Sequence, residues 1–364
     1  MKIKDITDYL ESIAPIDYQE SYDNSGLLVG DKNTPVKKVL ITLDATEEVV
    51  DEAIKGKYQL IIAHHPIIFG GLKKLNGKNY IERVVIKAIK NNIAIYAIHT
   101  NYDNASTGVN AKICERLGLT DCEILAPKKQ LLKKLYTFIP VEDLERISNA
   151  VFNAGAGYIG NYSETSFSVH GAGTFKGNEK SNPVVGKKNI LHQAVEMKFE
   201  TIFPANIESK VISALLKAHP YEEVAYDIVS LDNTFAKVGS GMVGNLKKPV
   251  DELTFLKSIK KNLKTDSIRY TKLLGKPIKR VAVCGGAGRF LLNNAIAAQA
   301  DVFITGDFKY HDFFDADGKI VVADVGHYES EQFTKDLLRE QIVRNFPMFA
   351  AQISKISTNP INYL

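Results

Sequence analysis

The chain has 364 residues, of which 45% are hydrophobic and 24% are charged. A chain of this length can form two or three domains of ordinary size and bury a full core without disulfide bonds. No apolar run approaches the roughly 20 residues that span a bilayer, and the N-terminal stretch MKIKDITDYLESI mixes charged with apolar residues as a secretory signal does not. The composition therefore predicts a soluble, cytoplasmic, globular protein with no membrane span.

Cysteine content and charge argue against two further classes. Cys114, Cys122 and Cys284 are too few, and odd in number, for a disulfide framework, and no two of them form a CxxC pair. The formal net charge of +4 is small for this length, and the lysines and arginines are scattered along the chain. A reducing compartment fits the cysteines, and a nucleic-acid partner is not expected.

The first third of the chain has the pattern of an α/β fold. Short apolar runs at 39–43, 60–63 and 93–98 alternate with amphipathic helical patterns at 47–56 and 82–91. Buried strands that alternate with helices are typical of βαβ units around a mainly parallel sheet.

The same pattern returns near the C-terminus. Apolar, β-rich runs at 280–286, 301–306 and 319–326 precede a clear helical pattern at 331–343. We therefore expect two α/β segments, at 1–127 and 236–364, that together form one domain.

The segment at 128–235, which separates the two α/β segments, has a different order of elements. A β-α-β-β-α-β order is the ferredoxin-like arrangement, and such a unit can be inserted where two connection points of the host lie close together. The expected elements are strands at 134–139, 164–170, 195–204 and 223–230, and helices at 141–154 and 206–219.

His64 and His65 follow the apolar run at 60–63. The carboxyl end of a strand in an α/β sheet is where ligands bind. Adjacent residues on a strand face opposite sides, so both imidazoles can line one site only if the backbone turns there, and Pro66 makes such a turn plausible. The alternative is a hydrogen-bonded pair beside a loop.

His99 and Asp103 follow the run at 93–98 in the same way. Asp103 can coordinate a cation or orient a ligating histidine, although a turn or a helix N-cap is the simpler explanation of that residue alone. His99 lies closer to the strand and is expected to support a ligand.

His327 and Glu331 follow the run at 319–326, after Gly326. Residues four apart share one face of a helix, so both side chains can address a single point. The alternative is a surface pair in a first helical turn, where the helix dipole favours acidic residues, and Glu329 fits that explanation.

The convergence of these strand ends predicts a metal site. Three ends that are distant in sequence each provide histidine, aspartate or glutamate, and the set exceeds the needs of one tetrahedral zinc ion. Two divalent ions that share a bridging carboxylate fit better. Mixed nitrogen and oxygen ligands suit Zn, Fe, Mn or Co and do not distinguish among them.

A glycine-rich turn, GGAGR, follows the strand at 280–286 and precedes a helical pattern. The backbone N–H groups of Gly286 and Gly288 are candidates for binding a phosphate at the start of that helix. The turn lacks the GxGxxG spacing and a Walker lysine, so a tight strand-to-helix turn is an equal alternative. A fourth strand end provides candidates for a pocket rim, namely Asp307, Tyr310 and His311.

As a set, six motifs resemble those of the NIF-three-like family, often labelled GTP cyclohydrolase type 2 homologues. The resemblance implies two α/β lobes around a dinuclear metal centre, and a ring, commonly a homohexamer. The stretch HPYEEVAYD at 219–227 resembles the PII-like or CutA-like insert of longer members. The motifs are YDNSGLLVG, AHHP, HTNYD, CGGAG, ITGDFKYHD and GHYESE. The implied metal ligands are His64, His65, Asp103, His327 and Glu331.

Two functions are consistent with these observations. The first is a metal-dependent hydrolase that acts on a nucleotide-like substrate such as GTP, in which His99 or Glu329 transfers protons. The second is a non-catalytic metal carrier or regulator, in which the insert senses a small molecule.

Overall fold

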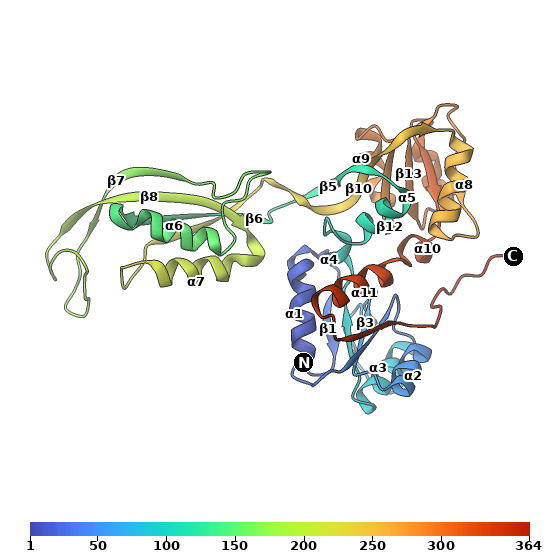
Figure 1. The fold of residues 1–364 in the computed structure, drawn as a ribbon, viewed down its shortest axis with the longest axis horizontal. Coiled ribbons are helices and arrows are strands. Elements are labelled where there is room, and N and C mark those ends of the chain that lie inside the picture. Colours follow the sequence, from blue (N-terminus) through green and yellow to red (C-terminus); the bar gives the residue numbers. More distant parts are fainter. The chain divides into compact units, whose positions relative to one another are not determined.

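A computed structural model describes all 364 residues. The chain forms two compact units (Figure 1). Residues 1–127 and 236–364 together make the first unit, and residues 128–235 make the second. No helix is long and apolar enough to cross a membrane.

The first unit contains two sheets. The first sheet is mainly parallel, as the alternation of strands and helices predicts, and only β1 runs antiparallel to its neighbour. In sheet order its strands are β1 (Gly26–Val29), β4 (Ala94–Ala97), β3 (Leu60–Ala63), β2 (Lys38–Thr42) and β15 (Ala350–Ile353).

Helices cover both faces of the first sheet. Alternate strand residues face opposite sides, so Leu40, Ile61 and Ile95 pack against one pair of helices, while Ile41 and Ile62 pack against the other side. The first pair is α2 (Glu47–Gly56) and α3 (Tyr80–Lys90), and the opposite face is covered by α1 (Ile3–Ile13) and α11 (Thr334–Asn345).

Local capping explains where α2 and α3 begin. The side chain of Thr46 accepts a hydrogen bond from the N–H of Val49, and the side chain of Asn79 accepts one from the N–H of Glu82. Each bond satisfies a helical N–H group that has no partner within its own helix.

The second sheet has a parallel centre of three strands, with antiparallel neighbours at β10 and β11. In sheet order its strands are β11 (Arg269–Tyr270), β14 (Val321–Asp324), β13 (Val302–Gly306), β12 (Ile278–Ala287), β10 (Thr234–Val250) and β5 (Thr120–Lys129). One face packs against α5 (Val109–Leu117) and α8 (Glu252–Leu263), and the other against α9 (Leu292–Ala297) and η5 (Tyr310–Ala316).

The two sheets exchange strands between the two halves of the chain. β5 comes from the N-terminal half and lies in the second sheet, whereas β15 comes from the C-terminus and lies beside β2 in the first sheet. One continuous core contains residues from both sheets, including Ile62 and Val283. The segments at 1–127 and 236–364 therefore do not correspond to one sheet each.

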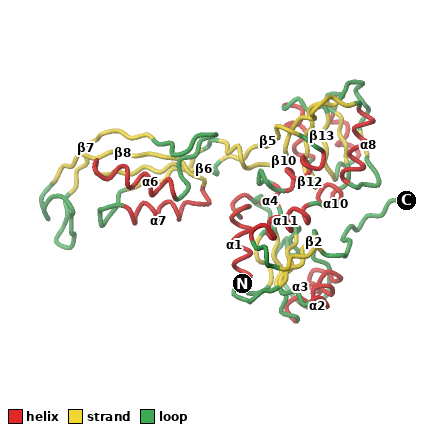
Figure 2. The backbone as a smooth tube through the Cα atoms, viewed as in Figure 1, coloured by secondary structure: helices red, strands yellow, loops and turns green.

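The second unit is a four-stranded antiparallel sheet with two helices (Figure 2). Both helices pack on one face, where Leu135 and Phe199 are wholly buried. In sheet order its strands are β7 (Phe167–Phe175), β8 (His192–Pro204), β6 (Leu132–Pro140) and β9 (Tyr226–Leu231), and its helices are α6 (Leu144–Asn153) and α7 (Glu208–Ala218). In chain order the elements run β-α-β-β-α-β, as the sequence predicts.

Candidate metal centre

The site of the first unit lies where three strands end. His64 and His65 follow β3 directly, Asp103 lies in the short helix α4 (Thr100–Asp103) after β4, and His327 and Glu331 begin and end α10 (His327–Glu331) after β14. β3 and β4 are neighbours in the first sheet and β14 belongs to the second, so the site draws on both sheets.

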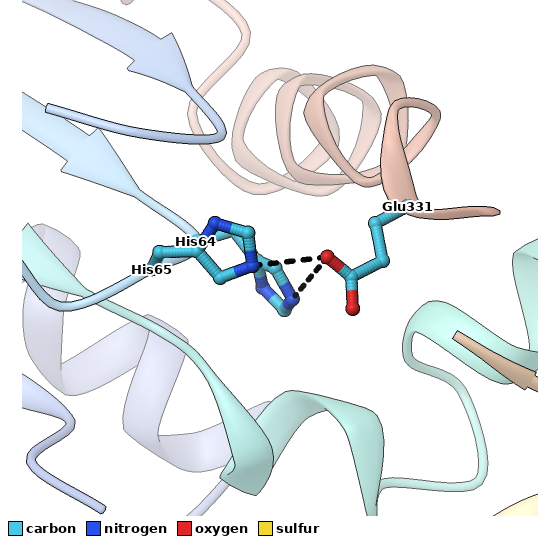
Figure 3. Close-up of side chains that lie close together, drawn as sticks. All are labelled: His64, His65 and Glu331. Carbon is cyan, nitrogen blue, oxygen red and sulfur yellow. Dashed lines mark hydrogen bonds and ion pairs between the residues drawn. The ribbon is translucent and has the colours of Figure 1, made fainter. Parts of the chain in front are cut away.

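The backbone turns at the histidine pair. β3 ends at Ala63, and His64 and His65 lie in a bend, so their rings come within 4.9 Å of each other, measured between centroids. Both imidazoles address the same carboxylate oxygen of Glu331 (Figure 3).

Glu331 Oε2 is the point where the cluster converges. It lies 3.0 Å from His65 Nε2, 3.2 Å from His327 Nε2 and 3.8 Å from His64 Nε2. Asp103 completes the group, with its Oδ1 3.5 Å from His64 Nε2. The five side chains singled out in the sequence thus lie together, and the cluster formed by His64, His65 and Glu331 has the spacing to hold a metal ion.

The Nδ1 atom of each imidazole makes a hydrogen bond to a neighbouring group. His64 Nδ1 donates to the carbonyl oxygen of Ile98, and His65 Nδ1 donates to Asp44, each at 2.8 Å. His327 Nδ1 donates to Asp307, also at 2.8 Å. In a neutral ring whose Nδ1 carries the hydrogen, Nε2 offers a lone pair, and this is how metal-binding histidines are commonly oriented.

The charges around His65 and His327 favour protonation. Burial lowers the pKa of His65, but Asp44 and Glu331 outweigh it and raise that pKa to about 10. Burial likewise lowers the pKa of His327, but Asp307 and Glu331 raise it to about 11. The Nε2 proton on each ring is the one that a bound metal ion would replace.

The two carboxylates of the cluster have opposite pKa shifts. Burial and the nearby charge of Glu331 raise the pKa of Asp103 well above its usual value. Burial would also raise the pKa of Glu331, but the hydrogen bond and the charge of His327, together with the neighbouring rings of His64 and His65, hold that pKa well below its usual value. A cation between the two carboxylates would remove their mutual repulsion.

Two buried atoms in the cluster have no hydrogen-bond partner, namely His64 Nε2 and Asp103 Oδ1. His64 is completely buried, and burial lowers the pKa of its ring. Buried polar atoms in proteins almost always have a hydrogen-bond partner. Two facing buried atoms without such a partner therefore suit a site that binds a ligand. The donor set present therefore fits a metal ion.

The two candidate proton-transfer residues differ in their surroundings. His99 faces the cluster, with its ring centroid 5.4 Å from those of His64 and His65, and its Nδ1 is hydrogen-bonded to Asp23 at 2.8 Å. Glu329 is buried, and its Oε1 accepts a hydrogen bond from Asn359 near the C-terminus.

The assignment of proton transfer to Glu329 is therefore not supported by the structure. His327 and Glu331 lie on one face of α10, and a residue midway between them lies on the opposite face. The neighbour that Glu329 contacts is the C-terminal segment, which the sequence pattern did not bring near it.

The glycine-rich turn is also different from a phosphate loop. The N–H of Gly286 donates to Ser330 Oγ and the N–H of Gly288 donates to Thr305 Oγ1, each at 2.9 Å and buried. Neither group is free for a phosphate oxygen. A Cβ at Gly286 would lie 2.4 Å from Glu331 Oε1, so this glycine leaves room for the central carboxylate.

Three aspartates hydrogen-bond the histidines of the site, and the sequence pattern did not predict this. Asp307, a candidate for a pocket rim, accepts a hydrogen bond from His327 Nδ1. Asp44, behind His65, follows the carboxyl end of β2, so the reasoning applied to the other strand ends would have found it. Asp23, behind His99, lies in a loop, and only its motif YDNSG marks it.

Known proteins give an independent result for the whole chain. The family model described as Duf34/NIF3 (NGG1p interacting factor 3) matches residues 1–360. The chain belongs to the Duf34/NIF3 family. A Bacillus subtilis member named "GTP cyclohydrolase 1 type 2 homolog" is 40% identical over 365 residues, which cover 99% of this chain and 98% of that protein.

Solved structures of Duf34/NIF3 proteins have the same fold. A Bacillus cereus protein related to NIF3 superimposes with a TM-score of 0.86 at 39% identity, covering 100% of this chain and 99% of that one. A Staphylococcus aureus protein superimposes with a TM-score of 0.79 at 31% identity, with the same coverage. The mixed α/β fold with several sheets is thus the fold of the family.

Proposed function

We propose that His64, His65, Asp103, His327 and Glu331 hold two divalent metal ions. The observation that carries this proposal is the buried pair formed by His64 Nε2 and Asp103 Oδ1, which face each other at 3.5 Å with no hydrogen-bond partner. Five donor side chains are more than the four ligands that one tetrahedral ion takes. Glu331 lies at the centre of the cluster, which suits a carboxylate shared by two ions. The mixed donors suit Zn, Fe, Mn or Co.

We further propose that the centre is that of a hydrolase acting on a nucleotide-like substrate. Divalent ions at such a site supply Lewis-acid activation of water and stabilise developing negative charge. Asp23 fixes the orientation of His99, whose ring faces His64 and His65, so His99 Nε2 is placed to transfer a proton beside them. The names of the relatives make GTP the first substrate to test.

Metal content tests the centre directly. Native protein is expected to carry two equivalents of divalent metal per chain, and His65→Ala and Glu331→Ala to carry one or none, measured by elemental analysis. His311→Ala is the matched control, because this exposed histidine also follows a strand end but lies outside the cluster. Equal metal content in all four proteins would contradict the assignment.

Turnover tests the hydrolase. Metal-loaded protein incubated with GTP is expected to open the purine imidazole ring and release formate. His99→Gln is expected to lower the rate while keeping the metal, because its ring contacts the cluster without being one of the proposed ligands. If metal-loaded protein releases no formate, GTP is excluded as the substrate, and ready transfer of metal to an acceptor would favour a carrier.

Two further properties are proposed from family membership. The second unit is proposed to be a PII/CutA-like insert, which its β-α-β-β-α-β order and antiparallel sheet support. The chain is proposed to assemble as a homohexameric ring. Light scattering on the protein as it elutes from a size-exclusion column is expected to give a mass six times that of the 40.3 kDa chain.

A further inference from the structure

The second unit contains a cavity that the metal centre does not explain. Its volume is about 460 Å³, which is within the range of small-molecule sites. It lies at one end of the sheet, on the face opposite α6 and α7, and is lined by β6, β7 and β8, the loop at 176–185, and the turn at 221–225.

The long loop after β7 forms part of the cavity wall. The N–H of Asn182 in this loop donates to Glu222 Oε1 at 2.6 Å, which ties the loop to the turn after α7. That turn belongs to the stretch HPYEEVAYD, which the metal centre leaves without a role.

Glu196 is a buried carboxylate in the wall of this cavity. It is 9% exposed and accepts one hydrogen bond, from the hydroxyl of Tyr221 at 2.9 Å. A Cβ at Gly173 would lie 2.4 Å from Glu196 Oε2, so the small neighbour on β7 leaves room for the carboxylate. Glu196 makes no ion pair, and a buried carboxylate without a cation is costly.

His219, which contacts Tyr221, does not supply a positive charge to Glu196. His219 accepts a hydrogen bond from the N–H of Tyr221 at Nδ1, and its Nε2 donates to the carbonyl oxygen of Phe138, so the ring is neutral. Burial lowers its pKa, which agrees with the neutral form. The charged residues of the lining are three glutamates and one lysine, namely Glu196, Glu222, Glu223 and Lys176.

The remainder of the lining is largely aromatic and aliphatic. Phe138, Phe175 and Tyr221 contribute aromatic rings to the cavity that Glu196 lines, and Tyr221 contacts Glu196 directly. Aromatic faces attract organic cations, and a carboxylate provides the counter-charge. One buried carboxylate and one phenol fall short of the six or more oxygen ligands that Ca²⁺ takes, and an excess of carboxylates disfavours an anion.

We propose that this cavity binds a small organic cation, with its ammonium group on Glu196 and its apolar body against Phe138, Phe175 and Tyr221. The site is separate from the metal centre, because every residue that lines it belongs to the second unit.

Calorimetric titration of the full-length protein with phenethylammonium tests this proposal. Phenylpropionate is the matched probe, since it has a similar ring and reach but the opposite charge. The ammonium compound is expected to bind and the carboxylate compound is not. Glu196→Gln, which keeps an acceptor for Tyr221, is expected to weaken binding by about tenfold or more, as when a desolvated charge pair loses one partner.

Two control variants locate the effect. Glu200→Gln removes a carboxylate from the same strand and face outside the cavity, and is expected to bind as the native chain does. His65→Ala is expected to bind normally too, which separates this site from the metal centre. The proposal is overturned if phenylpropionate binds as well as phenethylammonium, if neither binds, or if correctly folded Glu196→Gln retains full affinity.

Discussion

Glu331 in the first unit and Glu196 in the second are both buried carboxylates, but their surroundings differ. Glu331 Oε2 faces imidazole nitrogens of His64, His65 and His327. Glu196 accepts one hydrogen bond, from the hydroxyl of Tyr221, and lines a cavity with aromatic residues. Burial of an acidic group therefore does not by itself define the chemistry of a site. We expect the groups that face each carboxylate to select its ligand, a metal ion at Glu331 and an organic cation at Glu196.

The two regions also differ in how they are built. The candidate metal centre draws residues from the ends of strands in two sheets, and the Nδ1 atoms of its histidines donate hydrogen bonds to Ile98, Asp44 and Asp307. The cavity of the second unit is enclosed mainly by a loop and a turn, which are joined by a hydrogen bond from the N–H of Asn182 to Glu222 Oε1. The first arrangement is suited to fixed geometry, and the second to admitting a ligand by loop movement.

The largest expected effect is a loss of stability confined to the second unit. Phe199→Ala removes a completely buried ring from the core of that unit. It is expected to lower the free energy of unfolding by about 3–5 kcal/mol, measured by denaturant unfolding. Metal content is expected to be unchanged, because no proposed ligand lies in residues 128–235. Phe167→Ala, at a ring 65% exposed, is the control and is expected to change stability by less than about 0.5 kcal/mol.

The next effect concerns the space around Glu331. In Gly286→Ala the new Cβ meets Glu331 Oε1, and the positive φ of +61° adds roughly 1–3 kcal/mol of strain. We expect lower unfolding free energy together with loss of bound metal. Gly275→Ala has a similar φ of +72° but open space around it, so it isolates the backbone strain and is expected to keep its metal. Full metal content in Gly286→Ala would contradict the role given to this glycine.

A smaller effect is expected from the residue behind His65. Asp44→Asn removes the charge that holds the imidazole, and is expected to weaken metal affinity by about 10- to 100-fold in a chelator competition. Asp51→Asn, which removes an exposed partner of Lys87 in the same unit, is the control. If both variants bind metal equally well, Asp44 does not position His65.

The smallest effect is a pH dependence in the second unit. Burial lowers the pKa of His219 below its unfolded value near 6.5, so the unfolded chain takes up the proton more readily. Stability from this residue is therefore present above pH 6.5 and declines as pH falls through 6.5 toward the folded pKa. Unfolding from pH 7 to pH 5 is expected to show a steeper loss for the native chain than for His219→Gln. Parallel curves would show that His219 does not titrate on unfolding.

Much of the fold could be predicted from the order of apolar and polar residues along the chain. The apolar runs at 39–43, 60–63 and 93–98 predict β2, β3 and β4, because buried parallel strands need continuous apolar residues. The β-α-β-β-α-β order of the middle segment could also be predicted from the sequence. The exchange of β5 and β15 between the two sheets could not be predicted, because strand pairing depends on contacts between distant residues.

For the site, the sequence pattern predicts that His64, His65 and Asp103 gather, since they follow β3 and β4, and the carboxyl ends of neighbouring parallel strands meet at one edge of a sheet. That edge does not account for His327 and Glu331, because β14 lies in the second sheet. The sequence did not determine where each side chain points. Glu329 faces the C-terminal segment, and the N–H groups of Gly286 and Gly288 are used inside the protein. These directions depend on hydrogen-bond partners from distant segments of the chain, so they could be read only from the folded structure.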